Sequence, residues 1–373
     1  MLLHEFVNQD RIVRRQDSII AEFSAKRRIL STSPLNGGFR DNLTHAFIHC
    51  AERTEDAMLG ETYSEHIRAT GLILGLNTNT MCGISTGAYA ENAAIETRSF
   101  KDTEITALVT AGIDVNGGRS GDPAQWHETD TGYIHVPGTI NIMLFCNNNL
   151  TEGALARALI TSTEAKSAAI SELAVPSRYS RGLATGSGTD GVIIVADATS
   201  GLTLTEAGNH FKLGELIGQA VSAAVKNALY LETGLNTSRQ FNVFRRLDRF
   251  GLNHKHLTNK ILLSLSESKS NLPSINIENS ISDHFASRKL VVQSIIFAHL
   301  LDELSYGLIS TNDFIESINN VLISYHGNQF FTSSNVIAKF EIPDSSDQNI
   351  NSIIDRFISF YSDFLVFSYL RSV

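Results

Sequence analysis

The segment LATGSGTDGVIIVAD, residues 183–197, places a run of small and polar residues directly before an apolar, β-branched run. The sequence VIIV at 192–195 is typical of a buried strand. Before it, three glycines alternate with hydroxyl side chains and Asp190, and glycine lets a ligand approach the backbone closely. Loops at strand ends carry many of the sites of α/β proteins. The segment therefore predicts a core strand preceded by a ligand-binding loop.

The rest of the first part of the chain alternates short apolar runs with helical patterns. Strands are predicted at 28–31, 46–49, 105–109 and 140–145, and helices at 63–74, 151–173 and 213–231. Thr151 is a predicted N-cap, and Gly234 is predicted to end the last of these helices. Helices are interleaved with strands, but several strands follow one another directly. This order predicts an α/β fold, a layered sandwich with a mixed β-sheet and packed helices.

The distribution of glycine indicates two parts of the chain. All but three of its 26 glycines precede residue 240, the exceptions being Gly251, Gly307 and Gly327. We therefore predict an α/β domain at 1–240 and a mostly helical C-terminal extension at 241–373. Helices are expected at 289–309, 312–325 and 349–370, and the polar stretch 265–283 is interpreted as a loop or linker. The phenylalanines of the last helix predict a packed helix or an interface between copies of the chain.

Composition and residue spacing argue against several classes of function. A formal charge of −9 argues against a nucleic-acid or anionic-membrane surface. Cys50, Cys82 and Cys146 are too few and too scattered for a disulfide framework or a zinc site. His45 and His49 are four apart, but in a predicted strand, and no HExxH or CxxC motif occurs, so no metal site is expected. The N-terminus has no apolar signal region and no stretch reaches a membrane-spanning length, which predicts a cytoplasmic protein.

Known phosphate-binding and hydrolase motifs do not explain the glycine-rich loop. GSGTDG at 186–191 lacks the lysine that follows in a P-loop, and it precedes a strand instead of a helix. The same order of elements excludes a dinucleotide-binding G-x-G-x-x-G motif. No G-x-S-x-G nucleophile elbow occurs.

Five segments in order resemble one family. They are TAG (110–112), GTINI (138–142), STEAKSAA (162–169), ATGSGTD (184–190) and KLGELIG (212–218). Together they resemble the adenosylcobinamide amidohydrolase family of corrinoid salvage over about residues 25–235. The family more often reads TGTGTD at 185–190, and the segment 113–116 is more divergent. The residues after 240 have no counterpart in this resemblance.

The resemblance implies hydrolysis of the amide that joins a corrin propionate to aminopropanol. The products would be adenosylcobyric acid and aminopropanol. The implied partner is a small-molecule corrinoid, and no cofactor of the protein's own is implied because cobalt enters with the substrate. Two other classes stay open: a non-catalytic corrinoid-binding protein, and an amidase for another small molecule on the same scaffold.

Amide hydrolysis needs a nucleophile, a proton for the leaving amine and donors for the oxyanion. Asp190 is the first candidate to orient or deprotonate a water, and the alternative is a turn cap. Lys166 could protonate the amine or anchor a carboxylate. Glu164 is two residues from Lys166, so the two point in different directions on a helix, and either could lie at the surface. His210 is either a base or a residue near the helix cap.

Substrate contacts are expected from hydroxyl, amide and glycine positions at strand ends. Thr185 and Thr189 could act as nucleophiles, as hydrogen-bond donors or only as turn hydroxyls. Asn141 lies in an apolar strand, where an unpaired amide is costly, so it is either networked or directed at a ligand. The predicted substrate-binding residues are Asn36, Thr110, Asn116, Thr139, Asn141, Thr185, Gly186, Ser187, Gly188 and Thr189.

Overall fold

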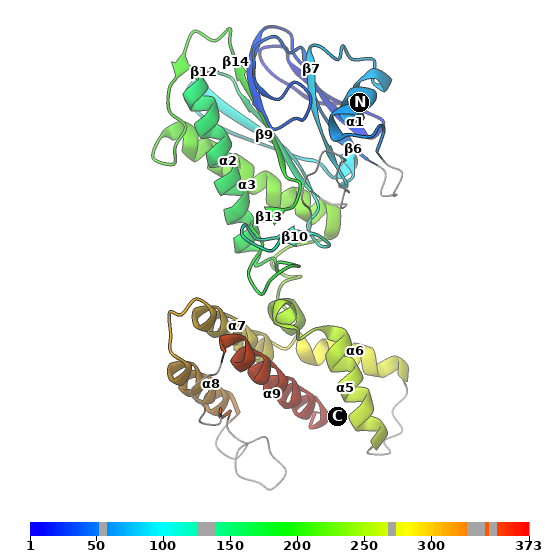
Figure 1. Cartoon of the computed structure of the whole chain (residues 1–373), viewed down its shortest axis with the longest axis vertical. Helices are drawn as coiled ribbons and strands as arrows, with labels where there is room; N and C mark the ends of the chain where they lie inside the picture. Colours follow the sequence, from blue (N-terminus) through cyan, green and yellow to red (C-terminus); the bar gives the residue numbers. More distant parts are fainter. Residues whose placement is uncertain (52–57, 125–138, 268–273, 327–339, 343–348, 373) are drawn as a thin grey trace. The chain divides into compact units, whose positions relative to one another are not determined.

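Two sheets stack face to face in the first of two units into which the chain divides, Met1–Asn236 and Thr237–Val373. The structure is a computed structural model (Figure 1), which describes all residues except 52–57, 125–138, 268–273, 327–339, 343–348 and 373.

The larger sheet is mixed and has six strands. Their order is β5 (Gly38–Arg40), β4 (Arg27–Ser31), β14 (Gly191–Asp197), β11 (Ile140–Cys146), β9 (Thr103–Ala111) and β8 (Ala94–Phe100). Only β11 and β14 run parallel, with Asn141 opposite Gly191; the other neighbours are antiparallel. All seven residues of β14 are buried, as its VIIV core predicts.

The second sheet has five strands, in the order β1 (Leu2–Glu5), β2 (Arg11–Arg15), β3 (Ser18–Glu22), β6 (His45–Cys50) and β7 (Met81–Thr86). Only β6 and β7 are parallel. Two two-stranded ladders complete the unit: β10 (Gly117–Gly118) with β13 (Gly186–Ser187), and β12 (Asn149–Leu150) with β15 (Thr203–Leu204). A 3-10 helix, η1, spans Ala90–Asn92.

Alternate residues of β14 show how the layers stack. Ile194 packs in the core shared with α2 (Glu152–Glu172) and α3 (Lys212–Thr233). Its neighbours Ile193 and Val195 pack instead against the five-stranded sheet, in a core that includes Ile84. On the far side of that second sheet, α1 (Tyr63–Ile73) contributes Ile67 to a smaller core. The unit is thus a four-layer α–β–β–α sandwich (Figure 1), which confirms the predicted layered α/β class.

Local sequence explains how these helices begin and end. The Thr151 side chain accepts a hydrogen bond from the backbone N–H of Ala154 at 3.2 Å and caps α2, as predicted. Gly234 ends α3 in the left-handed conformation, with φ of 71°. Near the start of α3, a Cβ on Gly214 would lie 2.1 Å from the carbonyl oxygen of Gly208, so the chain can pass this closely only at a glycine.

The C-terminal unit is helical, as predicted. It contains α4 (Val243–Leu247), the 3-10 helix η2 (Asp248–Phe250), α5 (His254–Glu267), α6 (Ser274–Phe285), α7 (Arg288–Ser305), α8 (Thr311–His326) and α9 (Ile350–Leu370). Its core is aromatic: Phe297 meets Phe357 edge-on, with ring centroids 5.2 Å apart, and Phe357 stacks on Tyr361 at 5.8 Å. The last helix is therefore packed within its own unit.

The interpretation of 265–283 as a loop or linker was wrong for 265–267 and 274–283, and 268–273 lie outside the described residues. Residues 265–267 lie at the end of α5, and α6 is a helix from Ser274 to Phe285. Its serines and asparagines gave the stretch a polar composition. Ile281 and Phe285, however, are four residues apart and both fully buried, which anchors the helix in the core. Within the described residues, no helix is both long and apolar enough to cross a membrane.

Candidate functional site

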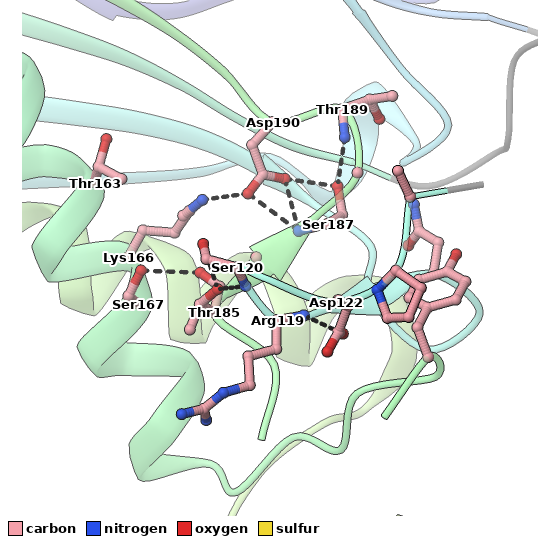
Figure 2. A pocket seen from close by; sticks show the side chains of 17 residues that line it. Arg119, Ser120, Asp122, Thr163, Lys166, Ser167, Thr185, Ser187, Thr189 and Asp190 are labelled. Atoms are coloured by element: carbon pink, nitrogen blue, oxygen red, sulfur yellow. Dashed lines mark hydrogen bonds and ion pairs between the residues drawn. The ribbon is translucent and has the colours of Figure 1, made fainter. Parts of the chain in front are cut away.

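A polar cavity of about 430 Å³ lies beside the loop that precedes β14 (Figure 2). Its walls come from the segment 116–124, from one side of α2, from Tyr179 and from the loop 185–190. The β10–β13 ladder joins two of these walls, because it pairs Gly117 with Ser187 and Gly118 with Gly186. Two glycine-punctuated segments that are far apart in the sequence therefore form one site.

Lys166 and Asp190 form an ion pair in the cavity wall, with side chains that are 9% and 13% exposed. Figure 2 shows Lys166 reaching from α2 toward the carboxylate. Asp190 also accepts hydrogen bonds from the backbone N–H of Ile140 at 3.0 Å and from that of Ser187 at 3.1 Å. The Ser187 hydroxyl donates to it at 2.6 Å. Asp190 is thus both the cap of its own turn and the partner of a buried lysine.

Gly186 lies directly beneath this ion pair. A Cβ at this position would be 2.2 Å from Asp190 Oδ2 and 2.6 Å from Lys166 Nζ, well inside van der Waals contact. Around Gly188, by contrast, nothing lies within 4 Å of a built Cβ. The first glycine of the loop makes room for the charged pair, and the second faces open space.

Hydroxyl groups line the cavity next to the ion pair. The Thr185 hydroxyl oxygen accepts a hydrogen bond from the backbone N–H of Ser120 at 3.0 Å and lies 3.2 Å from the Ser120 hydroxyl. The Ser167 hydroxyl donates to the Thr185 carbonyl at 2.9 Å. The Thr163 hydroxyl donates to the carbonyl of Leu159, one turn earlier on α2, at 3.0 Å.

These bonds determine what the wall can offer a ligand. The hydroxyl protons of Thr163, Ser167 and Ser187 are directed at protein acceptors, so these oxygens can only accept hydrogen bonds from a ligand. Lys166 keeps further ammonium protons besides the one directed at Asp190. The wall near the ion pair therefore combines one cationic donor with several acceptors, which suits a ligand rich in amide groups.

A second carboxylate, Asp122, lies on the opposite wall. It accepts hydrogen bonds from the Ser177 hydroxyl at 2.5 Å and the Arg119 backbone N–H at 2.8 Å. Burial acts to raise its pKa, but the hydrogen bonds from Ser177, Ser180 and Arg119 outweigh burial, and the net pKa lies below its usual range. Asp122 is therefore ionised at neutral pH.

The structure brings together some of the predicted site residues and not others. The cavity is lined by Asn116, Lys166, Thr185, Gly186, Ser187, Gly188, Thr189 and Asp190. Glu164, His210, Asn36, Thr110, Thr139 and Asn141 lie outside its lining. Gly138 of the GTINI segment falls outside the described residues.

Two of the four predicted catalytic residues lie at the surface. Glu164 accepts a hydrogen bond from the Asn209 side chain at 2.9 Å, in an exposed contact. His210 is exposed in the turn before α3. As expected from their spacing, Glu164 and Lys166 point in different directions, and only Lys166 reaches the cavity.

The remaining predicted binding residues bond to other parts of the protein. The Asn36 amide donates to the carbonyls of Thr78 and Met81, at 2.9 and 2.7 Å. The Thr139 hydroxyl donates to the Thr189 carbonyl at 2.5 Å. This bond stabilises the loop 185–190, although Thr139 itself does not line the cavity.

Asn141 and Thr110 face each other on neighbouring strands of the larger sheet. The Asn141 amide donates to the Ser85 carbonyl at 2.7 Å, which ties β11 to β7 of the other sheet. Both side chains are 1% exposed, between the sheets and not in the cavity wall. The Asn141 amide nitrogen is thus part of a network within the protein, whereas its buried Oδ1 has no hydrogen-bond partner among the described residues.

Sequence reasoning missed nine of the residues that line the cavity, six of which have polar side chains: Arg119, Ser120, Asp122, Thr163, Ser167 and Tyr179. Three of these six lie in the segment 109–122, whose glycines marked it as a strand-end loop. The pairing of that segment with 186–187 is a tertiary contact that no local pattern reports. Among the described residues, no three His, Cys, Asp or Glu side chains gather closely enough to hold a metal ion.

The fold and the site define an α–β–β–α sandwich with a buried lysine–aspartate pair in a polar cavity. The family model for adenosylcobinamide amidohydrolase (CbiZ) matches residues 3–237, and the chain belongs to this family, as its five segments predict. An uncharacterized protein of Methanocaldococcus jannaschii, MJ1613, is 35% identical over 246 residues, which cover 60% of this chain and 89% of that protein. Family membership implies a hydrolase that acts on an amide bond. The family match ends at 237, beside the division between the two units.

Proposed function

We propose that this protein hydrolyses the amide that joins a corrin propionate to aminopropanol in adenosylcobinamide. The products are adenosylcobyric acid and aminopropanol, and cobalt arrives with the substrate. The family match supports the substrate class. The main structural support is the ion pair of Lys166 and Asp190 in the wall of a polar cavity, because it indicates which residues take part in the reaction.

The size of the cavity suggests which part of the substrate enters it. Pockets of about 300–1,000 Å³ hold drug-sized ligands, and this cavity has about 430 Å³. A corrin ring with its adenosyl ligand is larger than such a ligand, whereas an aminopropanol arm is smaller. The arm and its amide therefore enter the cavity, and the macrocycle stays at its mouth.

Lys166 is suited to the carbonyl oxygen of the scissile amide. It is the cation of the ion pair, and its ammonium group has protons beyond the one directed at Asp190. A cation in a partly desolvated wall stabilises the negative charge that develops on that oxygen. The Thr185 hydroxyl lies in the same wall and supplies a second donor.

Asp190 takes part in the chemical step. When Lys166 turns to the substrate carbonyl, one carboxylate oxygen of Asp190 becomes free to accept a proton from water. The water oxygen attacks the carbonyl carbon as its proton moves to Asp190. Asp190 passes this proton to the amide nitrogen as the C–N bond breaks, and the remaining proton of the new carboxyl group moves to the freed amine, so that a carboxylate and an ammonium group result. Ser187 and the backbone of Ile140 hold the carboxylate in place throughout.

The test is turnover by the purified full-length chain. It is incubated with adenosylcobinamide, and mass spectrometry is used to look for adenosylcobyric acid and free aminopropanol. Release of both supports the proposal. Tight binding without release favours a non-catalytic corrinoid-binding protein, and the absence of binding favours an amidase for another small molecule.

A further inference from the structure

A second cavity, of about 290 Å³, lies within the C-terminal unit, where the ends of four helices meet. It is lined by the end of α6, the start of α7, and the ends of α8 and α9. Its polar lining includes His284, Ser287, Lys289, His326, Ser368 and Arg371, and none of the eight described residues that line it is acidic. The chain as a whole has 39 acidic and 30 basic residues. Among the described residues, the lining thus has one lysine, one arginine and two histidines but no acidic side chain, whereas acidic residues outnumber lysine and arginine in the chain as a whole.

The start of α7 adds to the positive potential. Its first turn contains Arg288 and Lys289 and no acidic residue. The N-terminal end of a helix carries the positive end of the helix dipole, so cations there are unfavourable unless an anion is near. Ser287 occupies the N-cap position without a side-chain capping bond. Lys289 forms no ion pair with any described residue.

The positive charge of Lys289 affects the pKa of a neighbouring histidine, His326. Burial and the positive charge of Lys289 lower the pKa of His326 to about 4. The ring of His284 lies 3.3 Å from the hydroxyl oxygen of Ser368, measured from Nε2. Burial lowers the pKa of His284 as well. Both imidazoles are therefore neutral at neutral pH. The Nε2–H of His326 is directed at the Gln293 side-chain oxygen at 3.4 Å, and both ring nitrogens of His284 lie 3.3 Å from serine hydroxyls, so the cations of this cavity are Lys289 and Arg371.

We propose that this cavity binds a phosphate group, either as free phosphate or as a phosphomonoester of a small molecule. Lys289 in the first turn of α7 and Arg371 at the C-cap of α9 both line the cavity, so two cations from different elements can neutralise a doubly charged anion. A guanidinium group binds phosphate oxygens in pairs. The backbone N–H groups at the start of α7 and the serine hydroxyls supply the remaining donors. This site is independent of the proposed amide hydrolysis.

Calorimetry on the full-length chain tests the proposal, with inorganic phosphate as the probe and ionic strength held constant with sodium chloride. We expect saturable one-to-one binding that Lys289→Gln and Arg371→Gln each weaken by about tenfold or more, because charge-assisted bonds are lost. Lys260→Gln is the matched control, since Lys260 pairs with Asp363 in the same unit but does not line this cavity. Glycerol phosphate in place of inorganic phosphate shows whether a monoester is accepted.

Histidine resonances locate the bound anion. Phosphate in this cavity should raise the pKa of His326 from about 4, because a nearby anion favours the protonated ring. Lys289→Gln alone should also raise it. Binding that leaves the His326 titration unchanged overturns the proposal, since the anion then sits elsewhere, for example near Lys166. No saturable binding at millimolar phosphate also overturns it. If one variant fails to fold, by circular dichroism, the other variant and the His326 titration decide.

Discussion

Lys166 and Asp190 are 24 positions apart in the chain, yet they form an ion pair directly above Gly186. Asp190 immediately precedes β14, and Lys166 lies on the buried side of α2. Packing of α2 against the larger sheet brings them together. Because Asp190 also accepts hydrogen bonds within its own turn, a useful substitution must separate its charge from its role as a cap.

The substitution Asp190→Asn removes the charge of Asp190 but keeps most of its role as the cap of the turn. The amide keeps the shape and one acceptor oxygen for the turn, but it removes the charge that pairs with Lys166. If Asp190 acts in the chemical step, kcat should fall by about 10²- to 10⁴-fold while corrinoid binding is largely kept. Turnover and melting temperature are measured on the same preparation.

Glu164→Gln and His210→Gln are the controls for that experiment. Both side chains lie at the surface and outside the cavity lining, so both variants should turn over at near the parent rate. If Asp190→Asn stays within about threefold of the parent, far short of the general-base range, but melts at a lower temperature, then Asp190 is only a turn cap.

The predictable part of the fold is the part with a strong local pattern. The strand 192–195 and the helices 151–173 and 213–231 have continuous apolar runs or regular helical spacing, and they occur within one or two residues of their predicted bounds. The strand β7 was not predicted. All six of its residues are buried, because it lies between two layers, and it shows no alternation of polar and apolar residues.

The site residues, too, could be predicted only where the local sequence pattern is strong. The glycine-rich loop at 183–191 is recognisable from its sequence because small residues and a carboxylate stand before an apolar strand. Arg119 and Asp122 come from a second loop, and their place depends on the pairing of Gly117 with Ser187. Lys166 and Glu164 look alike in the sequence as charged residues of one helix. Only the packing of α2 determines which of the two is buried.

A buried charge cluster at Arg27 should determine the stability of the first unit. Arg27 is 1% exposed and donates to Asp10 at 2.7 and 2.8 Å and to Asp197 at 3.0 Å. Arg27→Met leaves two buried carboxylates without this cation, which should cost about 3–5 kcal/mol. Amide exchange of β4 and β14 measures the loss locally. Arg11→Met, which breaks an exposed pair with Glu5, should cost less than about 1 kcal/mol.

Low pH should reduce the stability that this charge cluster gives to the first unit. Burial acts to raise the pKa of Asp197, but hydrogen bonds from Thr199 and Asn8 and the charge of Arg27 outweigh it, so the folded-state pKa is lowered. The unfolded chain, with a pKa of about 3.9, then binds the proton more readily than the folded protein. The stabilisation is complete above about pH 5 and is lost as pH falls through the folded pKa. Asp197→Asn should lower stability at neutral pH and flatten this acid dependence in thermal melts.

The C-terminal unit should be dispensable for the chemistry. The family match ends at 237, and every described residue that lines the cavity near Asp190 belongs to the first unit. A chain shortened to 1–236 should therefore retain turnover of adenosylcobinamide, provided that circular dichroism shows an intact fold. Complete loss of turnover in a folded fragment would contradict this expectation and make the C-terminal unit part of the site.

The two glycines of the loop offer the sharpest test of the ion pair, because they differ by two positions and not in chemistry. A methyl group at Gly186 would overlap Asp190 Oδ2 and Lys166 Nζ, whereas at Gly188 it would meet nothing within 4 Å. Displacing a catalytic group by about 1 Å can cost about 100-fold in rate. Gly186→Ala should therefore reduce kcat by about that factor, and Gly188→Ala should leave it nearly unchanged. Equal effects of the two substitutions on kcat, with both variants folded, would show that the position of the Lys166–Asp190 pair does not limit the reaction.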